Sequence, residues 1–256
     1  MVVHRSVGGS SKAAGGITPG LCCRLRLPKK GRHMTDSNKT LIAALLDRSG
    51  SMDESKEFTE DGWRELINTQ RSEPEYCEVM LAQFDTEYEV LYPPTAIAAV
   101  PEFVVVPRGM TALLDSAGKF ITEVGELLAA LPEDQRPGRV ICLIMTDGME
   151  NSSHQWDWEA VKKLIIQQRE VYGWKFIFLG ADIDAVEVGA RMGVDPRYAM
   201  TFDKRSHSTV RAAYARTSAV MTDFKRDYLD DEGFTESDRA RAMGEAPKKK
   251  SKKRGA

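Results

Sequence analysis

The 256-residue sequence lacks the features that define several classes of protein. It has only four cysteines, and no two of them form a C-x-x-C pair, so neither a disulfide framework nor a cysteine-based zinc site is expected. No apolar run approaches the roughly 18 residues that a membrane-spanning helix requires. The polar, glycine-rich start does not resemble the apolar stretch of a secretory signal. These absences predict a cytoplasmic protein without a membrane partner.

The motifs of common enzyme classes are also missing. The sequence contains no G-x-S-x-G elbow, no phosphate-binding P-loop and no G-x-G-x-x-G dinucleotide fingerprint. It has four histidines, and neither His154 nor His207 has a metal-type partner at helical spacing. We therefore expect surface histidines and no catalytic residues.

Charge is distributed unevenly along the chain. The formal net charge is −2, but residues 1–33 and 247–256 together hold 13 of the 36 basic residues and none of the 38 acidic ones. The remaining chain is strongly acidic, which is not typical of a nucleic-acid-binding domain. Contact with nucleic acid is expected only through the basic C-terminal run PKKKSKKR, which also resembles a nuclear-import signal.

Composition divides the chain into three parts. Residues 1–37 are basic, rich in glycine and serine and without periodicity, which predicts disorder. An organelle transit peptide is one alternative, and a true start at Met34 is another. Residues 38–230 are predicted to form one domain, and residues 231–256 a disordered basic tail.

Two apolar runs each end in a polar turn. The first, Thr40–Leu46, is followed by Asp47, Ser49 and Ser51, and the second, Arg139–Met145, by Thr146-Asp147-Gly148. Such short runs are typical of buried parallel strands. In a doubly wound sheet the carboxyl ends of neighbouring strands meet at one edge, so both aspartates are expected there.

Carboxylates and hydroxyls together form an all-oxygen set of ligands. Asp47, Ser49 and Ser51 alternate, so one tight turn can direct all three side chains to one point, and Thr111 offers a further hydroxyl at the start of a predicted helix. This chemistry suits a small hard cation such as Mg²⁺. The alternative is a structural one, since aspartate and serine are also common helix caps.

The rest of the pattern alternates strands with helices, which predicts an open α/β sheet. Helices are predicted at 57–70, 111–131, 158–172, 184–192 and 206–228, and further strands at 76–84, 87–92, 174–179 and 198–202. The alternating segment 87–92 is typical of an antiparallel edge strand, and Pro93-Pro94 are expected to end it.

The segments DRSGS at 47–51, GMT at 109–111 and TDGMEN at 146–151 resemble the von Willebrand factor type A (VWA) family. In their order and spacing they match its metal-ion-dependent adhesion site (MIDAS). The resemblance implies a Rossmann-like, doubly wound, mostly parallel sheet with helices on both faces. It also implies Mg²⁺ or Mn²⁺ bound by Asp47, Ser49, Ser51, Thr111 and Asp147. Around the ion we predict a partner-binding rim of Arg48, Gly109, Met110 and Met149.

Three hypotheses for function follow. The favoured one is an intracellular adaptor that binds an Asp or Glu of a partner protein through the ion. The resemblance implies that such an adaptor can act beside an AAA+ ATPase or within a larger assembly, as some family members do. The second is a structural component of a virus, phage or other assembly, in which the ion only stabilises the fold. The third is a phosphohydrolase-like enzyme that uses Asp47 as a nucleophile.

Overall fold

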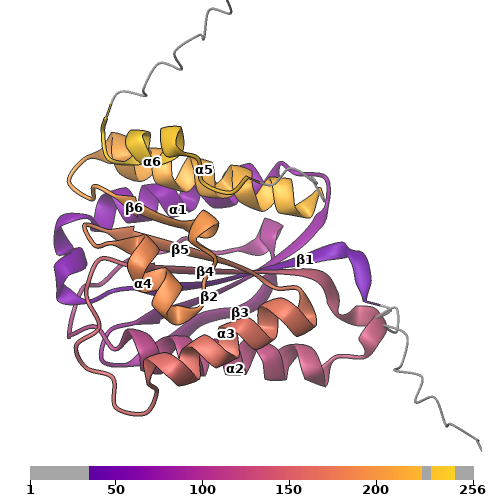
Figure 1. Ribbon diagram of the computed structural model, residues 1–256. Helices are drawn as coiled ribbons and strands as arrows, with labels where there is room; N and C mark the ends of the chain where they lie inside the picture. The colour runs from indigo at the N-terminus through magenta and orange to yellow at the C-terminus, as the bar shows by residue number, and fades with distance from the viewer. Residues whose placement is uncertain (1–34, 227–231, 246–256) are drawn as a thin grey trace, which may run out of the picture. The chain divides into compact units, whose positions relative to one another are not determined.

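The computed structural model describes residues 35–226 and 232–245, so the predictions for 1–34 and 246–256 lie outside the described residues. A six-stranded sheet runs through the domain in the order β3-β2-β1-β4-β5-β6 (Figure 1). The strands are β1 (Asp36–Asp47), β2 (Tyr76–Phe84), β3 (Tyr88–Ala96), β4 (Pro137–Thr146), β5 (Lys175–Ala181) and β6 (Ala199–Phe202).

β1 lies in the middle of the sheet and pairs in parallel with both β2 and β4. Its apolar residues 41–46 are at most 1% exposed, which explains the unbroken apolar run in the sequence. The chain places β2 and β3 on one side of β1 and β4, β5 and β6 on the other. The strand order therefore reverses between β1 and β4; Asp47 is the last residue of β1, and Asp147 directly follows β4.

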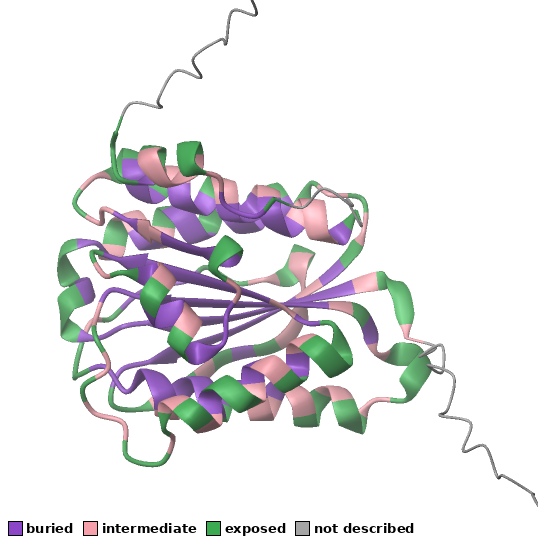
Figure 2. Cartoon of the chain, in the orientation of Figure 1, coloured by how far each residue is buried: buried purple, intermediate pink, exposed green. Residues whose placement is uncertain are grey.

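Helices cover both faces of the sheet, as predicted. In Figure 1, α1 (Lys56–Arg71), α5 (His207–Lys225) and α6 (Glu236–Ala242) lie on one face, and α2 (Leu113–Ala130) and α3 (Trp158–Tyr172) on the other, with α4 (Ala185–Met192) beside α3. Figure 2 shows the strands buried between these layers. Short 3₁₀ turns are Gly50–Glu54, Ile97–Ala99, Glu133–Gln135 and Pro196–Tyr198. Among the described residues, no helix has the length and apolar character that crossing a bilayer requires.

The antiparallel edge strand is confirmed, but the prediction that Pro93-Pro94 end it is wrong. β3 continues to Ala96, and its last residues pair with Val79 and Glu78 of β2 after two shifts of register. Proline is tolerated here because an edge strand has hydrogen-bonding partners on one side only, and the irregular register accommodates the missing donors.

The prediction of disorder from residue 231 onward is wrong for the described part of that segment. Thr235 and Asp238 form a capping box that starts α6. Phe234 and Ala242 are buried, and Arg239 donates hydrogen bonds to the carbonyls of Ala199 and Pro196 at the start of β6. Two apolar anchors suffice to dock a helix of seven residues, although its overall composition is polar.

Gly62 illustrates a packing constraint between α1 and α5. A Cβ atom at this position would lie 2.4 Å from the Tyr214 ring, whereas a Cβ at Gly125 in α2 would meet its nearest atom at 4.0 Å. Alanine is favoured over glycine in a free helix by about 1 kcal/mol, but overpacking a core costs about 1–3 kcal/mol. We expect Gly62→Ala to lower the melting temperature and Gly125→Ala to raise it, as measured by circular dichroism. Equal shifts in the two variants would contradict this packing.

Candidate metal centre

Three loops meet at the carboxyl edge of β1, β2 and β4, and backbone hydrogen bonds join them. The amide of Arg48 donates to the carbonyl of Phe84 at 2.8 Å, and the amide of Gly50 donates to the carbonyl of Gly109 at 3.3 Å. The amide of Arg108 in turn donates to the carbonyl of Arg48 at 2.8 Å. The segment that leads into Thr111 is thus fixed against the loop that follows Asp47.

Three of the five predicted oxygen ligands, Ser49, Ser51 and Asp147, lie in contact across this edge. The Ser51 hydroxyl donates to Asp147 Oδ1 at 2.6 Å, and the Ser49 hydroxyl lies 3.0 Å from that of Ser51 and 3.5 Å from the same carboxylate oxygen. The Asp147 side chain has no exposed surface, whereas Ser51 is exposed. The cluster therefore opens to solvent on the Ser51 side.

Asp47 lies beneath this cluster and is fully buried. Its Oδ1 accepts from the Ser49 amide and its Oδ2 from the Thr146 hydroxyl, both at 2.6 Å. Burial raises the pKa of Asp47 to about 6; these hydrogen bonds oppose the increase, and the nearby charge of Asp147 adds to it. With both oxygens engaged, the carboxylate holds the 47–51 loop in place.

Thr111 is positioned by the loop that follows β4. Its amide donates to Asn151 Oδ1 at 3.0 Å, and its carbonyl accepts from the Asn151 amide at 3.1 Å. A Cβ atom at Gly148 would lie only 2.6 Å from Thr111 Oγ1. Glycine is therefore required beside Asp147 so that the threonine hydroxyl can approach this loop.

Two further acidic residues fix the same loop against α2. Glu150 Oε2 accepts from the Leu114 amide at 2.8 Å. Asp115 accepts from three backbone amides of residues 154–156, at 2.7–2.8 Å. Burial of Asp115 acts to raise its pKa, but these amide donors outweigh it and hold the pKa below its ordinary value. Sequence reasoning missed both residues, because their partners are backbone groups of another segment.

Asp85 was also missed, although it directly follows β2 and Asp47 is the last residue of the neighbouring β1. Its Oδ2 accepts from Nε of both Arg48 and Arg108 at 2.8 Å, and the Glu87 amide donates to its Oδ1 at 2.7 Å. Burial acts to raise its pKa, yet the hydrogen bond from Arg108 and the other donors lower it overall. The signal available in the sequence was an acid directly after a buried strand.

Three of the four residues of the predicted rim are exposed, and the fourth is buried. Gly109 is exposed, and Met110 and Met149 are 54% and 63% exposed on the loops that flank the cluster. Arg48 is only 6% exposed, and its guanidinium is paired with Asp85 and Glu89. It serves to join segments within the domain, because the partners that neutralise it lie directly after β2 and on β3.

A lysine that sequence analysis did not identify completes the cluster. Lys204 follows β6, and its Nζ donates to Asp147 Oδ2 at 2.7 Å and to the Ser51 carbonyl at 3.0 Å. Its side chain is 13% exposed. No motif marks this residue, since its partners lie 57 and 153 positions away in the sequence.

These residues fit a small divalent cation. Asp47, Asp147 and three hydroxyls offer only oxygen atoms, which Mg²⁺ and Mn²⁺ prefer. The Asp147 carboxylate forms an ion pair with the Lys204 ammonium, which shows that a positive charge can be bound beside this carboxylate. Within residues 35–226 and 232–245 no group of three His, Cys, Asp or Glu side chains is suited to a metal, so the hydroxyls are essential to any site here.

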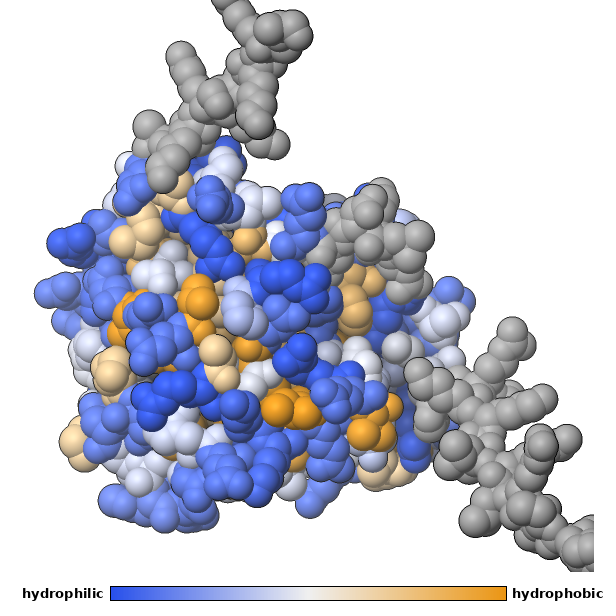
Figure 3. Space-filling model, viewed as in Figure 1, coloured by the Kyte–Doolittle hydropathy of each residue, from blue (hydrophilic) through white to orange (hydrophobic). Residues whose placement is uncertain are grey.

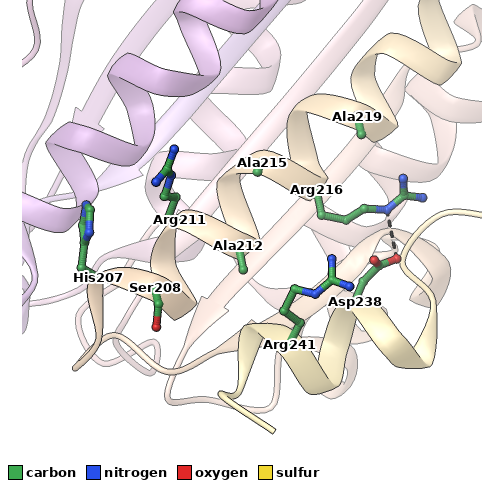
Figure 4. Close-up of a pocket in the computed structure, with 9 residues that line it drawn as sticks. All are labelled: His207, Ser208, Arg211, Ala212, Ala215, Arg216, Ala219, Asp238 and Arg241. Atoms are coloured by element: carbon green, nitrogen blue, oxygen red, sulfur yellow. Dashed lines mark ion pairs between the residues drawn. The ribbon is translucent and has the colours of Figure 1, made fainter. Parts of the chain in front are cut away.

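Other surface features have a different character. A hollow of about 540 Å³ lies between α5 and α6, and the residues that line it, mainly arginine and alanine, are drawn in Figure 4. Arg216 pairs there with Asp238 at 3.0 Å, and Arg211 pairs with Glu65 at 2.8 Å. The face of the molecule seen in Figure 3 is mostly hydrophilic, with only small hydrophobic areas.

No protein-family model and no curated protein matches this chain. Among solved structures it is similar to proximal thread matrix protein 1 from the mussel byssus with a zinc-occupied MIDAS motif, at 17% identity and a TM-score of 0.52, covering 70% of this chain and 47% of that one. A von Willebrand factor type A protein from Catenulispora acidiphila is 14% identical with a TM-score of 0.51, covering 71% and 42%.

The pilus adhesin SpaC from Lactobacillus rhamnosus GG is 13% identical with a TM-score of 0.54, covering 74% of this chain and 30% of that one. This chain thus spans less than half the length of each of these neighbours. At identities this low, the similarity is evidence for a shared fold only. The strand order, the antiparallel edge strand and the two helical layers described above agree with that fold. The chain has the fold of a von Willebrand factor type A domain.

Proposed function

We propose that this protein is a divalent-metal-dependent protein-interaction module of VWA type. The supporting observation is the convergence of the Ser49, Ser51 and Asp147 side chains at the strand-order reversal, above a buried Asp47. A bound Mg²⁺ or Mn²⁺ would supply a coordination position for a carboxylate oxygen of a partner. The partner we propose is an acidic side chain, Asp or Glu, of another protein.

The residues around such a site would have different roles in binding the ion and the partner. Ser49, Ser51 and Thr111 offer neutral hydroxyls, which leave most of the charge of a cation available to an anionic partner. Asp147 supplies a negative charge at the centre, and Asp47 holds the loop because both its oxygens accept hydrogen bonds. Met110 and Met149 add exposed apolar surface beside the opening. An acidic partner residue flanked by apolar side chains would fit best.

The same geometry favours binding over catalysis by Asp47. A nucleophilic carboxylate must reach its substrate, but Asp47 is fully buried and both its oxygens are engaged. We therefore propose an adaptor rather than a phosphohydrolase, acting in the cytoplasm with an AAA+ ATPase or as part of a larger assembly.

Metal binding is the first test. We expect Mg²⁺ to stabilise the protein against unfolding, by about 2.7 kcal/mol at a concentration one hundred times the dissociation constant, because only the folded state holds the ligands together. Ser49→Ala and Thr111→Ala should remain folded and lose this increment. Thr69→Ala, which removes an exposed hydroxyl from α1, should retain it. Thermal unfolding with Mg²⁺ or EDTA measures the effect, and a full increment in both site variants would exclude these hydroxyls.

Partner recognition is the second test. Wild type and Asp147→Ala are used for affinity capture from the native lysate, each with Mg²⁺ or with EDTA. Partners should appear only with wild type in Mg²⁺, and neutralising the partner's Asp or Glu should abolish capture. Identical partners in all four samples would refute metal-bridged recognition and favour a structural role in an assembly.

A further inference from the structure

The contact between Lys204 and Asp147 is built into the fold. The turn that carries Lys204 is fixed from several sides: the Asp203 amide donates to the carbonyl of Ala242 in α6 at 3.1 Å, and the Thr209 hydroxyl of α5 donates to the Asp203 carbonyl. The Asp203 carboxylate also accepts from the Arg205 amide at 2.9 Å. These contacts hold the backbone, so the Lys204 side chain starts from a defined point at the edge of the metal centre.

The ammonium competes for the group that the metal centre needs. Lys204 Nζ donates hydrogen bonds to Asp147 Oδ2 and to the Ser51 carbonyl, while the Ser51 hydroxyl donates to Asp147 Oδ1. Both oxygens of Asp147 are therefore engaged by groups of the chain itself. A divalent ion at this carboxylate would lie close to the ammonium, and like charges repel strongly where the surroundings are partly buried.

We propose that Lys204 is an internal counter-cation of the metal centre, which occupies Asp147 when no divalent ion is bound and has to withdraw when one binds. This inference rests on the proposed metal site and adds a determinant of its affinity. The lysine neutralises the Asp147 carboxylate, so that the ion-free fold does not carry two uncompensated aspartates at one edge. The same contact raises the concentration of divalent ion that is needed to fill the site.

The decisive variant is Lys204→Met, which keeps the aliphatic stem and removes the charge. We expect it to bind Mn²⁺ about tenfold more tightly than wild type, a change that corresponds to about 1.4 kcal/mol. In EDTA the same variant should melt at a lower temperature, because Asp147 loses its partner. A higher Mn²⁺ affinity together with a lower melting temperature in EDTA distinguishes this mechanism from a merely structural role. A structural role would weaken folding and metal binding together.

Arg205→Gln is the matched control. It removes a positive charge from the neighbouring residue, whose side chain is 74% exposed and paired with Asp203. Solvent screens such a charge, so its Mn²⁺ affinity should stay within about twofold of wild type. Free Mn²⁺ measured by electron paramagnetic resonance gives the binding directly. As a second readout, amine acylation mapped by mass spectrometry should label Lys204 more strongly in wild type when Mn²⁺ is added, and not in Ser49→Ala.

The outcomes separate this inference from the proposed function. Tighter binding by Lys204→Met supports the inference, and measurable binding by this variant alone would support it most strongly. Equal or weaker binding by Lys204→Met, with wild type binding and Ser49→Ala not, would overturn the inference and leave the metal site intact. Absence of binding in wild type and Lys204→Met alike would overturn both.

Discussion

In metal-free buffer, the Asp47 carboxyl is expected to reduce the free energy of unfolding by roughly 3 kcal/mol as the pH rises from about 4 to about 7, at about 1.36 kcal/mol per unit of pKa shift. Burial is the main reason that its pKa rises from the ordinary 3.8 to about 6 in the folded protein. Between these two values the folded state binds more protons than the unfolded state. This contribution to stability is therefore complete below about pH 4 and is lost as the pH rises through 6.

Asp47→Asn should remove this pH dependence and stabilise the ion-free protein at pH 7. The amide can replace the carboxylate in its contacts: its oxygen accepts from the Ser49 amide, and its NH₂ donates to the Thr146 hydroxyl, which lies 3.1 Å from the Gly148 carbonyl and can donate there. The variant should also lose the stabilisation by Mg²⁺, because the negative charge that balances a cation is gone.

Urea unfolding in EDTA at several pH values, for wild type and variant, measures the difference. Asp115→Asn is a control in which the substitution should have the opposite effect on stability. The pKa of the Asp115 carboxyl is lowered, because backbone amides stabilise its charge. Asp115→Asn should therefore destabilise the protein at pH 7. If the free energy of unfolding depends on pH in the same way in wild type and Asp47→Asn, the pKa of Asp47 is not raised as its burial indicates.

Asp85→Ala is expected to cost about 3–5 kcal/mol of the free energy of unfolding, because it removes the buried partner of Arg48 and leaves only the exposed Glu89 to balance that charge. Asp85 is 1% exposed and Arg48 6% exposed, and the same carboxylate also accepts from Arg108. The loop that follows Asp47 and the segment that leads into Thr111 would lose this common anchor, so Mn²⁺ affinity should fall together with stability.

Chemical denaturation measures the loss, and two further variants interpret it. Glu159→Ala removes the exposed ion pair with Lys163 and should leave the free energy of unfolding almost unchanged, because solvent screens such a pair. Adding Arg48→Met to Asp85→Ala should restore part of the stability, because the buried charge that has lost its buried partner is removed as well. A loss below about 1 kcal/mol for Asp85→Ala alone would show that the pair does not hold the loops.

The sequence by itself determined the elements and the meeting point of the two aspartates. β2 and α3 have the predicted limits, because a nine-residue apolar strand and an amphipathic helix carry their signal in local periodicity. Asp47 and Asp147 lie at the carboxyl ends of buried parallel strands, and the carboxyl ends of neighbouring strands share one edge. Neither conclusion requires knowledge of any distant side chain.

The partners of the charged residues were decided only by the tertiary structure. Arg48 looked exposed in a polar turn, but Asp85, 37 positions further on, draws it inward. Lys204, which follows β6, reaches Asp147, which follows β4, across the intervening strand β5, and α6 is held by two apolar residues and the start of β6. A charge is neutralised by whichever opposite charge the fold brings within reach, and that distance in space is not encoded in any local pattern of the chain.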